Sequence, residues 1–272
     1  MNFREFFELC IGVNEVVIVH NAVEERFRVE EGQLVINLNL CAKFYSESCE
    51  EIFRYRAGNQ APDILKSATT ATIINGEFHT AWNVKLELIS SLDIVQELHM
   101  TCLSLMIHRK SSIGWFYLYT LLKQDSSLID SFRSKLELLL ERHPRNYYTW
   151  MYLFKIFKEI YFEDYKTQEF YQTLSFCESH IKDSSSFHYL LLISIELNKL
   201  PDLFLWAIRV CQSYYGPDGL YIERSPPGYE NFCNLLKNLR SLNTVSDSNL
   251  SSFIISQRSL GRDNLLNKYF TQ

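Results

Sequence analysis

Basic side chains stand five residues ahead of two of the chain's tryptophans. Lys110 precedes Trp115 at this distance, and Arg145 precedes Trp150 in the same way. A fixed ammonium or guanidinium group can stabilise negative charge that develops on a bound anion. A lysine at the start of a helix is, however, more often an exposed, solvated cation. Both interpretations of Lys110 stay open on the residues alone.

Two tyrosines, Tyr147 and Tyr148, lie between the second basic residue and its tryptophan. A phenol hydroxyl can donate a hydrogen bond to an anion, although a tyrosine at helical spacing more often fills a core. The seven histidines show no H-x-x-x-H or H-E-x-x-H spacing, and the seven cysteines form no C-x-x-C pair. No G-x-S-x-G, Walker or dinucleotide pattern is present either. The chain therefore has no catalytic or metal-binding signature of its own.

The aromatic residues next to these side chains recur with a nearly constant period. Trp82, Trp115, Trp150 and Phe187 are successively 33, 35 and 37 residues apart. A period of this size is typical of stacked supersecondary units. About 35 residues hold two helices of roughly 13 residues and two turns. We therefore expect these four aromatics to pack between helical hairpins, with Phe232 in the same place in a fifth, degenerate pair.

Apolar residues at steps of three and four predict the helices of this repeat. Each unit is expected to contain two antiparallel helices, with the marked aromatic early in the second. The predicted helices are Pro62–Ile74, Phe78–Ser91, Asp93–His108, Ser111–Lys123, Ser126–Arg142, Pro144–Tyr161, Thr167–Ile181, Ser184–Asn198, Pro201–Tyr214 and Gly228–Leu242.

The two ends of the chain depart from the repeat. The β-branched segment Glu15–His20 could be extended, whereas Val35–Arg56 is predicted to be helical. Residues 1–60 are accordingly predicted to form an N-terminal cap region, and residues 61–242 the array of helical hairpins. Residues 243–272 are predicted to contain a Ser- and Asn-rich linker and a closing helix over Leu260–Phe270.

Composition narrows the class of protein. Hydrophobic residues make up 47% of the 272 residues and aromatic residues 14%, which argues against disorder. The net charge of −5 provides no strong basic field, so nucleic acid is not an expected partner. No apolar run approaches the roughly 18 residues of a transmembrane helix, so no membrane insertion is expected. Scattered, unpaired cysteines are typical of a reducing compartment, so a cytoplasmic location is predicted.

The segment His143–Trp150, which reads HPRNYYTW, resembles the repeat of protein prenyltransferase α subunits, with arginine in the place of the usual lysine. Three further stretches resemble a divergent branch of that family: Phe78–Ile89, Asp183–Tyr189 and Phe53–Arg56. The resemblance extends over nearly the whole chain and is patchy before Gln60.

The resemblance implies an all-α fold, a right-handed, crescent-shaped superhelix (α-solenoid) of about five antiparallel hairpins of the prenyltransferase α-subunit type. It implies a heterodimer, because such subunits wrap around a β subunit that holds the catalytic zinc and the isoprenoid pocket. No metal or cofactor is expected on this chain. The divergent branch implies a geranylgeranyltransferase III-like enzyme with a Rab geranylgeranyltransferase β subunit. Its substrates would be geranylgeranyl diphosphate and a protein with a C-terminal cysteine, such as a SNARE.

The same resemblance assigns roles to individual residues. Lys110 occupies the position of a catalytic lysine that stabilises the departing diphosphate, and Tyr147 that of a tyrosine near the same group. Tyr148 falls at the neighbouring position, which often holds histidine in the family. All three are therefore predicted to lie near the isoprenoid diphosphate.

Two departures from the family pattern keep alternatives open. The usual Trp-x-x-Arg arginine is replaced by Lys85, Leu118, Leu153 and Leu190, which predicts a more apolar seam between hairpins. The proline-rich N-terminal segment of farnesyltransferase α subunits is also missing. The principal alternative is a non-catalytic helical-repeat scaffold of the tetratricopeptide type, although this glycine-poor chain lacks the small residues which that repeat expects.

Overall fold

The computed structural model describes residues 2–19, 27–215, 231, 234–235 and 237–239. The chain divides into two compact units, Met1–Tyr152 and Leu153–Gln272. The first unit begins with α1 (Phe3–Ile11), β1 (Glu15–Val19), β2 (Phe27–Glu30), β3 (Gln33–Asn37) and α2 (Leu38–Arg56). Its hairpins follow as α3 (Ile64–Ile74), α4 (His79–Glu87), η1 (Ile89–Ser91), α5 (Ile94–Ile107), α6 (Ser112–Gln124), η2 (Ser126–Leu128) and α7 (Ile129–Arg142). The division falls within α8 (Tyr147–Glu159), after which come α9 (Glu163–Ser179), α10 (Ser184–Glu196) and α11 (Leu200–Tyr215).

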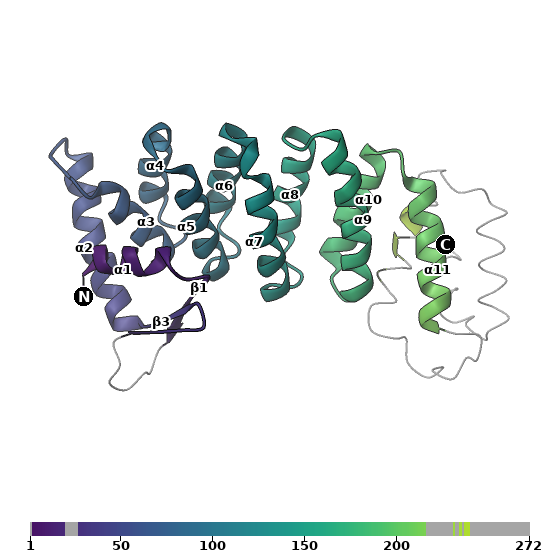
Figure 1. Ribbon diagram of the computed structural model, residues 1–272, viewed down its shortest axis with the longest axis horizontal. Helices are drawn as coiled ribbons and strands as arrows, with labels where there is room; N and C mark the ends of the chain where they lie inside the picture. Colours follow the sequence, from purple (N-terminus) through teal and green to yellow (C-terminus); the bar gives the residue numbers. More distant parts are fainter. Residues whose placement is uncertain (1, 20–26, 216–230, 232–233, 236, 240–272) are drawn as a thin grey trace. The chain divides into compact units, whose positions relative to one another are not determined.

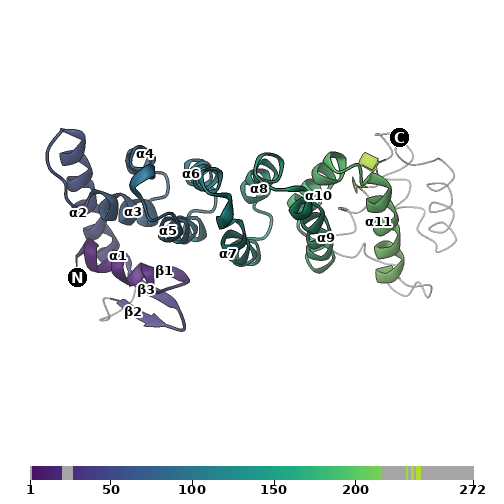
Figure 2. The same ribbon diagram turned by 45° about the horizontal axis from the view of Figure 1, so that its top comes forward.

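The hairpins of the first unit form two layers (Figure 2). Helices α3, α5 and α7 pack against one another in one layer, and α4 packs against α6 in the other. The hairpins α3–α4 and α5–α6 each join a helix of the first layer to one of the second. The predicted fold class, an α-solenoid of helical hairpins, is thereby confirmed within the first unit. Its right-handed crescent and the domain limits at 60 and 242 stay predictions.

Several predicted helix ends are corrected by local geometry. The predicted helices Phe78–Ser91 and Ser126–Arg142 each divide into an α-helix and a short 3₁₀ turn. The predicted helix Pro144–Tyr161 begins at Tyr147, because Arg145 adopts a left-handed backbone with φ 63° that cannot continue a helix.

The second unit contains a hairpin of α9 and α10, followed by α11, which packs on α10 (Figure 1). Helix α9 begins at Glu163, four residues before the predicted start at Thr167. Of the predicted helix Gly228–Leu242, only residues 231, 234–235 and 237–239 are described, and these are helical. Phe232, the linker and the closing helix Leu260–Phe270 lie outside the described residues.

Helix α1 was not predicted from the sequence. The Asn2 side chain accepts hydrogen bonds from the backbone N–H groups of Arg4 and Glu5, and the Glu5 carboxylate accepts one from the Asn2 backbone N–H, which completes a capping box. One face of this helix is buried, through side chains at steps of three and four: Phe3, Phe6, Phe7 and Cys10. This face joins a core with residues of β1, β3, α2, α3 and α5.

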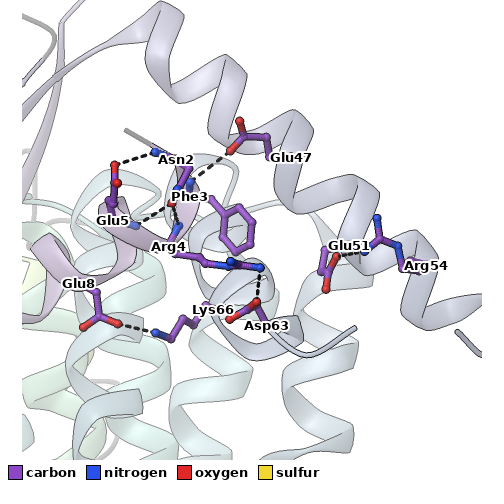
Figure 3. Close-up of polar contacts among 10 residues, drawn as sticks. All are labelled: Asn2, Phe3, Arg4, Glu5, Glu8, Glu47, Glu51, Arg54, Asp63 and Lys66. Carbon is purple, nitrogen blue, oxygen red and sulfur yellow. Dashed lines mark hydrogen bonds and ion pairs between the residues drawn. The ribbon is translucent and has the colours of Figure 1, made fainter. Parts of the chain in front are cut away.

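Polar contacts connect the outer face of α1 to its neighbours (Figure 3). Arg4 pairs with Asp63 at 2.5 Å, and Lys66 of α3 pairs with Glu8 at 2.5 Å. The backbone N–H of Phe3 donates to Glu47 of α2 at 3.3 Å. Because the two ion pairs are largely exposed, they add little free energy and mainly fix the orientation of a helix that the core already holds.

A three-stranded sheet lies between α1 and α2 in the chain. The strand order is β1-β3-β2, with β1 parallel and β2 antiparallel to β3. The two-residue turn from β2 to β3 has positive φ at Glu31 (47°) and Gly32 (80°), as a type I′ hairpin requires. The extended segment predicted at Glu15–His20 is confirmed over Glu15–Val19. The helix predicted from Val35 instead begins at Leu38, because the preceding residues pair with β1.

Candidate functional site

Each buried tryptophan of the first hairpins is anchored to the loop ahead of its helix. The indole Nε1 of Trp82 donates to the carbonyl oxygen of Gly76 at 2.8 Å. Trp115 Nε1 donates to the carbonyl oxygen of Arg109 at 3.1 Å. In both hairpins the acceptor lies six residues before the tryptophan, so the buried ring fixes the path of the loop.

The same two carbonyls also accept a hydrogen bond from the following hairpin. Ser111 Oγ donates to Gly76 O at 2.6 Å, and Asn146 Nδ2 donates to Arg109 O at 2.9 Å. We call the carbonyls of Gly76 and Arg109 the junction carbonyls. Each accepts from the tryptophan of its own hairpin and from Ser111 or Asn146 of the following hairpin. Ser111 and Asn146 each stand four residues before the next tryptophan. They therefore align successive loops along one edge of the array.

Histidines at the ends of α5 and α7 repeat a further contact. His108 Nε2 lies 2.9 Å from the carbonyl oxygen of Ile73, and His143 Nε2 contacts the carbonyl oxygen of Met106. Because a carbonyl only accepts, Nε2 must carry the proton in both rings. Burial lowers the pKa of His108. Sequence reasoning missed this role, although His108, His143 and His180 are 35 and 37 residues apart, like the aromatics.

The predicted site residues lie in one loop of this edge and at the start of the helix that follows the next loop. Lys110 is exposed in the loop between α5 and α6, next to Arg109. Tyr147 and Tyr148 are the first two residues of α8, with 53% and 39% of their surface exposed. The hydrogen bond from Asn146 to Arg109 O brings the backbone beside Tyr147 to the backbone beside Lys110. Among the described residues, Lys110 forms no hydrogen bond or ion pair.

A second set of contacts fastens the start of α8 to α6. The Tyr152 hydroxyl donates to the carbonyl oxygen of Ser112 at 3.1 Å, and its ring stacks on Trp115 at 6.1 Å between centroids. Tyr147 and Tyr148 are in edge contact at 6.5 Å. The arrangement presents an ammonium group from a loop and two phenols from the start of α8 at the surface, with the backbones of the two segments joined by the Asn146 hydrogen bond. Such a surface can bind an anionic group.

Behind this edge, Lys85 is completely buried, and the sequence analysis did not predict its burial. Its Nζ lies 2.5 Å from Glu97 Oε1 and 4.6 and 4.9 Å from the ring centroids of Trp82 and Tyr117. Burial lowers the pKa of Lys85, against the opposing effect of Glu97. Lys85 occupies the arginine position of the Trp-x-x-Arg pattern that begins at Trp82, so this hairpin has a basic residue at that position.

At the corresponding positions the leucines are also buried: Leu118, Leu153 and Leu190. In the second unit, the Glu169 carboxylate accepts hydrogen bonds from Tyr189 at 3.0 Å and Thr173 at 3.4 Å. Glu169, Thr173 and Tyr189 lie 72 positions after Glu97, Thr101 and Tyr117. In the first unit, Thr101 and Tyr117 are the corresponding neighbours of the Glu97 carboxylate. A buried acid is therefore repeated in alternate hairpins, although the lysine is not.

The other predicted packing residues are buried as well, with exposed fractions of 3% for Trp150 and 4% for Phe187. Across residues 2–19 and 27–215, no group of three or more His, Cys, Asp or Glu side chains is placed to hold a metal ion. No helix in this part of the chain is long and apolar enough to cross a membrane.

Comparison with known proteins points to the same segment of the array. The sequence pattern of the protein prenyltransferase alpha subunit repeat matches residues 134–160, which include most of α7, the Arg145 loop and α8. The chain is similar to the human protein prenyltransferase alpha subunit repeat-containing protein 1, with 27% identity over 180 residues. The match covers 55% of this chain and 45% of the human protein, so the chain spans less than half of that relative's length. The hairpins, the buried tryptophans and this matched repeat agree: over residues 134–160 the chain is similar to the protein prenyltransferase alpha subunit repeat.

Proposed function

We propose that this chain is an α-like subunit of a heterodimeric protein prenyltransferase. The observation that carries the proposal is the repeat match over residues 134–160, because it contains the loop that Asn146 holds against the Lys110 loop. In the finer form of the proposal, the partner is a Rab geranylgeranyltransferase β subunit and the enzyme is geranylgeranyltransferase III-like. The lipid would come from geranylgeranyl diphosphate and pass to a protein's C-terminal cysteine, such as that of a SNARE.

In this proposal, the chain contributes positioning and charge. As the carbon–oxygen bond to the diphosphate breaks, negative charge accumulates on the leaving group. The exposed Lys110 ammonium would stabilise that charge, and the Tyr147 hydroxyl would donate a hydrogen bond to it. Tyr148 would lie beside the same group. The zinc that activates the substrate thiol would belong to the β partner.

Co-expression with each of three β subunits tests the pairing: the farnesyltransferase, geranylgeranyltransferase type I and Rab types. We expect stable capture of the Rab type, followed by transfer of geranylgeranyl to a protein with a C-terminal cysteine. Capture of a different β subunit would correct the finer proposal. Failure to capture any of the three would overturn the assignment as an α-like subunit.

Substitution of Lys110 tests the chemistry separately from the pairing. Lys110→Ala is expected to leave capture of the β subunit unchanged and to lower the transfer rate by about 10²-fold, the usual cost of removing one group that stabilises developing charge. Lys43→Ala on α2, whose side chain is 58% exposed, is the matched control and should have no effect. Unchanged transfer by Lys110→Ala would remove Lys110 from the mechanism.

A non-catalytic scaffold is the second candidate. It is favoured by the buried leucines at three of the family's arginine positions, since these show that the repeat has diverged. Capture of a β subunit without any lipid transfer by the wild-type complex would support this candidate.

A further inference from the structure

A pocket of about 360 Å³ lies within the first unit, away from the loops that carry Lys110 and Tyr147. It is bounded by the turn between β2 and β3, the start of β1, α5 and α7. Its size is within the range of small-molecule sites in proteins. The apolar part of its lining comes from α5 and α7 and consists of Cys102, Leu103, Met106 and Leu138. Burial raises the pKa of the Cys102 thiol to about 12, so this side chain is neutral.

The polar side of the pocket contains a histidine whose protonation is fixed by its neighbours. His99 Nε2 lies 3.0 Å from the carbonyl oxygen of Cys10, so Nε2 carries the proton and donates. The other ring nitrogen, Nδ1, lies 3.0 Å from Lys135 Nζ. A neutral imidazole can only accept at this nitrogen, so the ammonium is the donor. Burial lowers the pKa of His99, and the charge of Lys135 lowers it further.

Lys135 has no acidic partner in the described part of the chain. Its hydrogen bond to His99 uses one of three N–H groups and neutralises no charge. The other cation of the pocket is already paired, because Arg142 donates to Glu15 Oε2 at 2.7 Å and Gln33 donates to the same atom. Lys135 is thus a half-buried cation without a counter-ion, next to an apolar wall.

We propose that this pocket binds a carboxylate carried on a short apolar stem. The carboxylate accepts hydrogen bonds from the two remaining N–H groups of Lys135, and the stem packs on Leu103, Met106 and Leu138. A charge-assisted hydrogen bond in a partly dehydrated pocket is stronger than one in open water, because the local dielectric constant is lower. The exposed Glu31 carboxylate on the opposite turn disfavours a ligand with a second negative charge.

Two sources supply this chemistry: a free short-chain acid, or the C-terminus of a peptide that ends in leucine. Hexanoate and the peptide acetyl-Gly-Gly-Leu represent them, and hexylammonium has the stem with the opposite charge. Each is titrated into the full chain while the ring resonances of His99 are followed by NMR, with His99→Gln used to assign them.

We expect a saturable shift of the His99 resonances with hexanoate, the peptide or both, and the tighter of the two identifies the source. Bound carboxylate offsets the charge of Lys135, so the pKa of His99 should rise on binding. Glu15, Glu31 and Arg142 are the other charged groups that face the pocket.

Two variants keep the proposal falsifiable. Lys135→Met removes the ammonium and should weaken binding at least about tenfold. Ser134→Trp leaves Lys135 in place but obstructs the pocket at an exposed position, and should also weaken it. Lys43→Met is the matched control and should bind like the wild type. The proposal is overturned if neither acid gives a saturable shift, if Lys135→Met binds as well as the wild type, or if hexylammonium binds equally.

Discussion

Lys85 is a charged side chain without access to water. An isolated ammonium in such a place would cost many kcal/mol, and burial accordingly lowers its pKa. Glu97 and the faces of Trp82 and Tyr117 offset this cost at 2.5, 4.6 and 4.9 Å. Removal of either Lys85 or Glu97 leaves the other buried without its partner. Loss of one residue should therefore destabilise the first hairpins more than loss of both.

Lys85→Met should therefore destabilise the protein by about 3–5 kcal/mol, because it leaves the Glu97 carboxylate buried without its cation. The double variant Lys85→Met/Glu97→Met should recover most of the loss. Urea unfolding followed by circular dichroism measures both. Lys66→Met, which removes an exposed pair with Glu8, is the control and should cost less than about 1 kcal/mol. A cost for Lys85→Met no larger than the control's would contradict this account.

His108 makes folding sensitive to mild acid. Its pKa is lower in the folded protein than the ordinary value of 6.5, because the ring is buried. Between the lowered pKa and 6.5, the unfolded chain binds more protons than the folded one, so the free energy of unfolding increases with pH. Stability should thus be lost as the pH falls below 6.5.

Urea unfolding at a series of pH values from 7.5 to about 5 checks the direction of this effect. His108→Gln keeps an N–H donor for the Ile73 carbonyl but cannot titrate, so its pH dependence should be shallower than that of the wild type. His79→Gln, at an exposed position, should leave the wild-type slope unchanged. Equal slopes in all three proteins would exclude His108 as the cause.

At the scale of elements, the junction carbonyls connect one hairpin to the next. Ser111 has two roles, since its hydroxyl donates to Gly76 O and accepts from the backbone N–H of Gly114 at the start of α6. Asn146 reaches back to Arg109 O from the loop before α8. A loop that ends one hairpin helix therefore also forms part of the next hairpin.

Ser111→Ala should destabilise the protein by about 1–3 kcal/mol, because it removes an N-cap and leaves a buried carbonyl with one hydrogen bond fewer. Thermal and urea unfolding give this value. Thr120→Ala removes a hydroxyl that only bonds to its own helix, and should change stability by less than about 0.5 kcal/mol. Similar effects of the two substitutions would show that the Ser111 contact adds nothing beyond local helix propensity.

The elements that could be predicted are those whose signal lies within the segment. The helices from Ile64 to Tyr215 were foreseen because apolar residues recur on one face of each. β3 was partly taken for a helix, because its five residues are recognisable as a strand only through pairing with β1. The late start of α8 depends on the left-handed backbone of Arg145, for which the residue type gives no warning. The missed helix α1 did carry a usable signal in Asn2 and Glu5.

For the candidate site, too, the sequence predicted which positions are buried but not which groups meet in space. The period of the tryptophans correctly indicated buried positions. Their hydrogen bonds to carbonyls six residues earlier could not be foreseen, because backbone acceptors leave no trace in residue types. Lys135 and His99 are 36 residues apart and meet only once α5 and α7 are packed, so the pocket was not visible in the sequence.

On the scale of the whole molecule, stability should be transmitted between neighbouring hairpins. Stacked repeats contact only adjacent units, so their cooperativity depends on the strength of each interface. In the first unit the junction carbonyls are a clear part of that interface. Weakening two of them together should affect how the chain unfolds as well as how stable it is.

The variant Ser111→Ala/Asn146→Ala should therefore unfold over a broader range of urea, with a lower apparent m-value than the wild type. Circular dichroism and tryptophan fluorescence should also give separated transitions, since hairpins would no longer unfold together. Coincident transitions with an unchanged m-value would show that the apolar seam alone maintains cooperativity.

The junction carbonyls also restrict where the repeat can change in length. From the histidine that ends the first helix to the aromatic of the second, the interval is seven residues at His108, His143 and His180. From each aromatic to the next histidine it grows from 26 to 28 to 30. All variation in the period thus lies between an aromatic and the next histidine. This interval includes the connections between successive hairpins, at η1, at η2 and between α8 and α9. Natural or engineered insertions should be tolerated there, whereas one added residue between Arg109 and Ser111 would change the spacing between Trp115 and its acceptor, the carbonyl oxygen of Arg109.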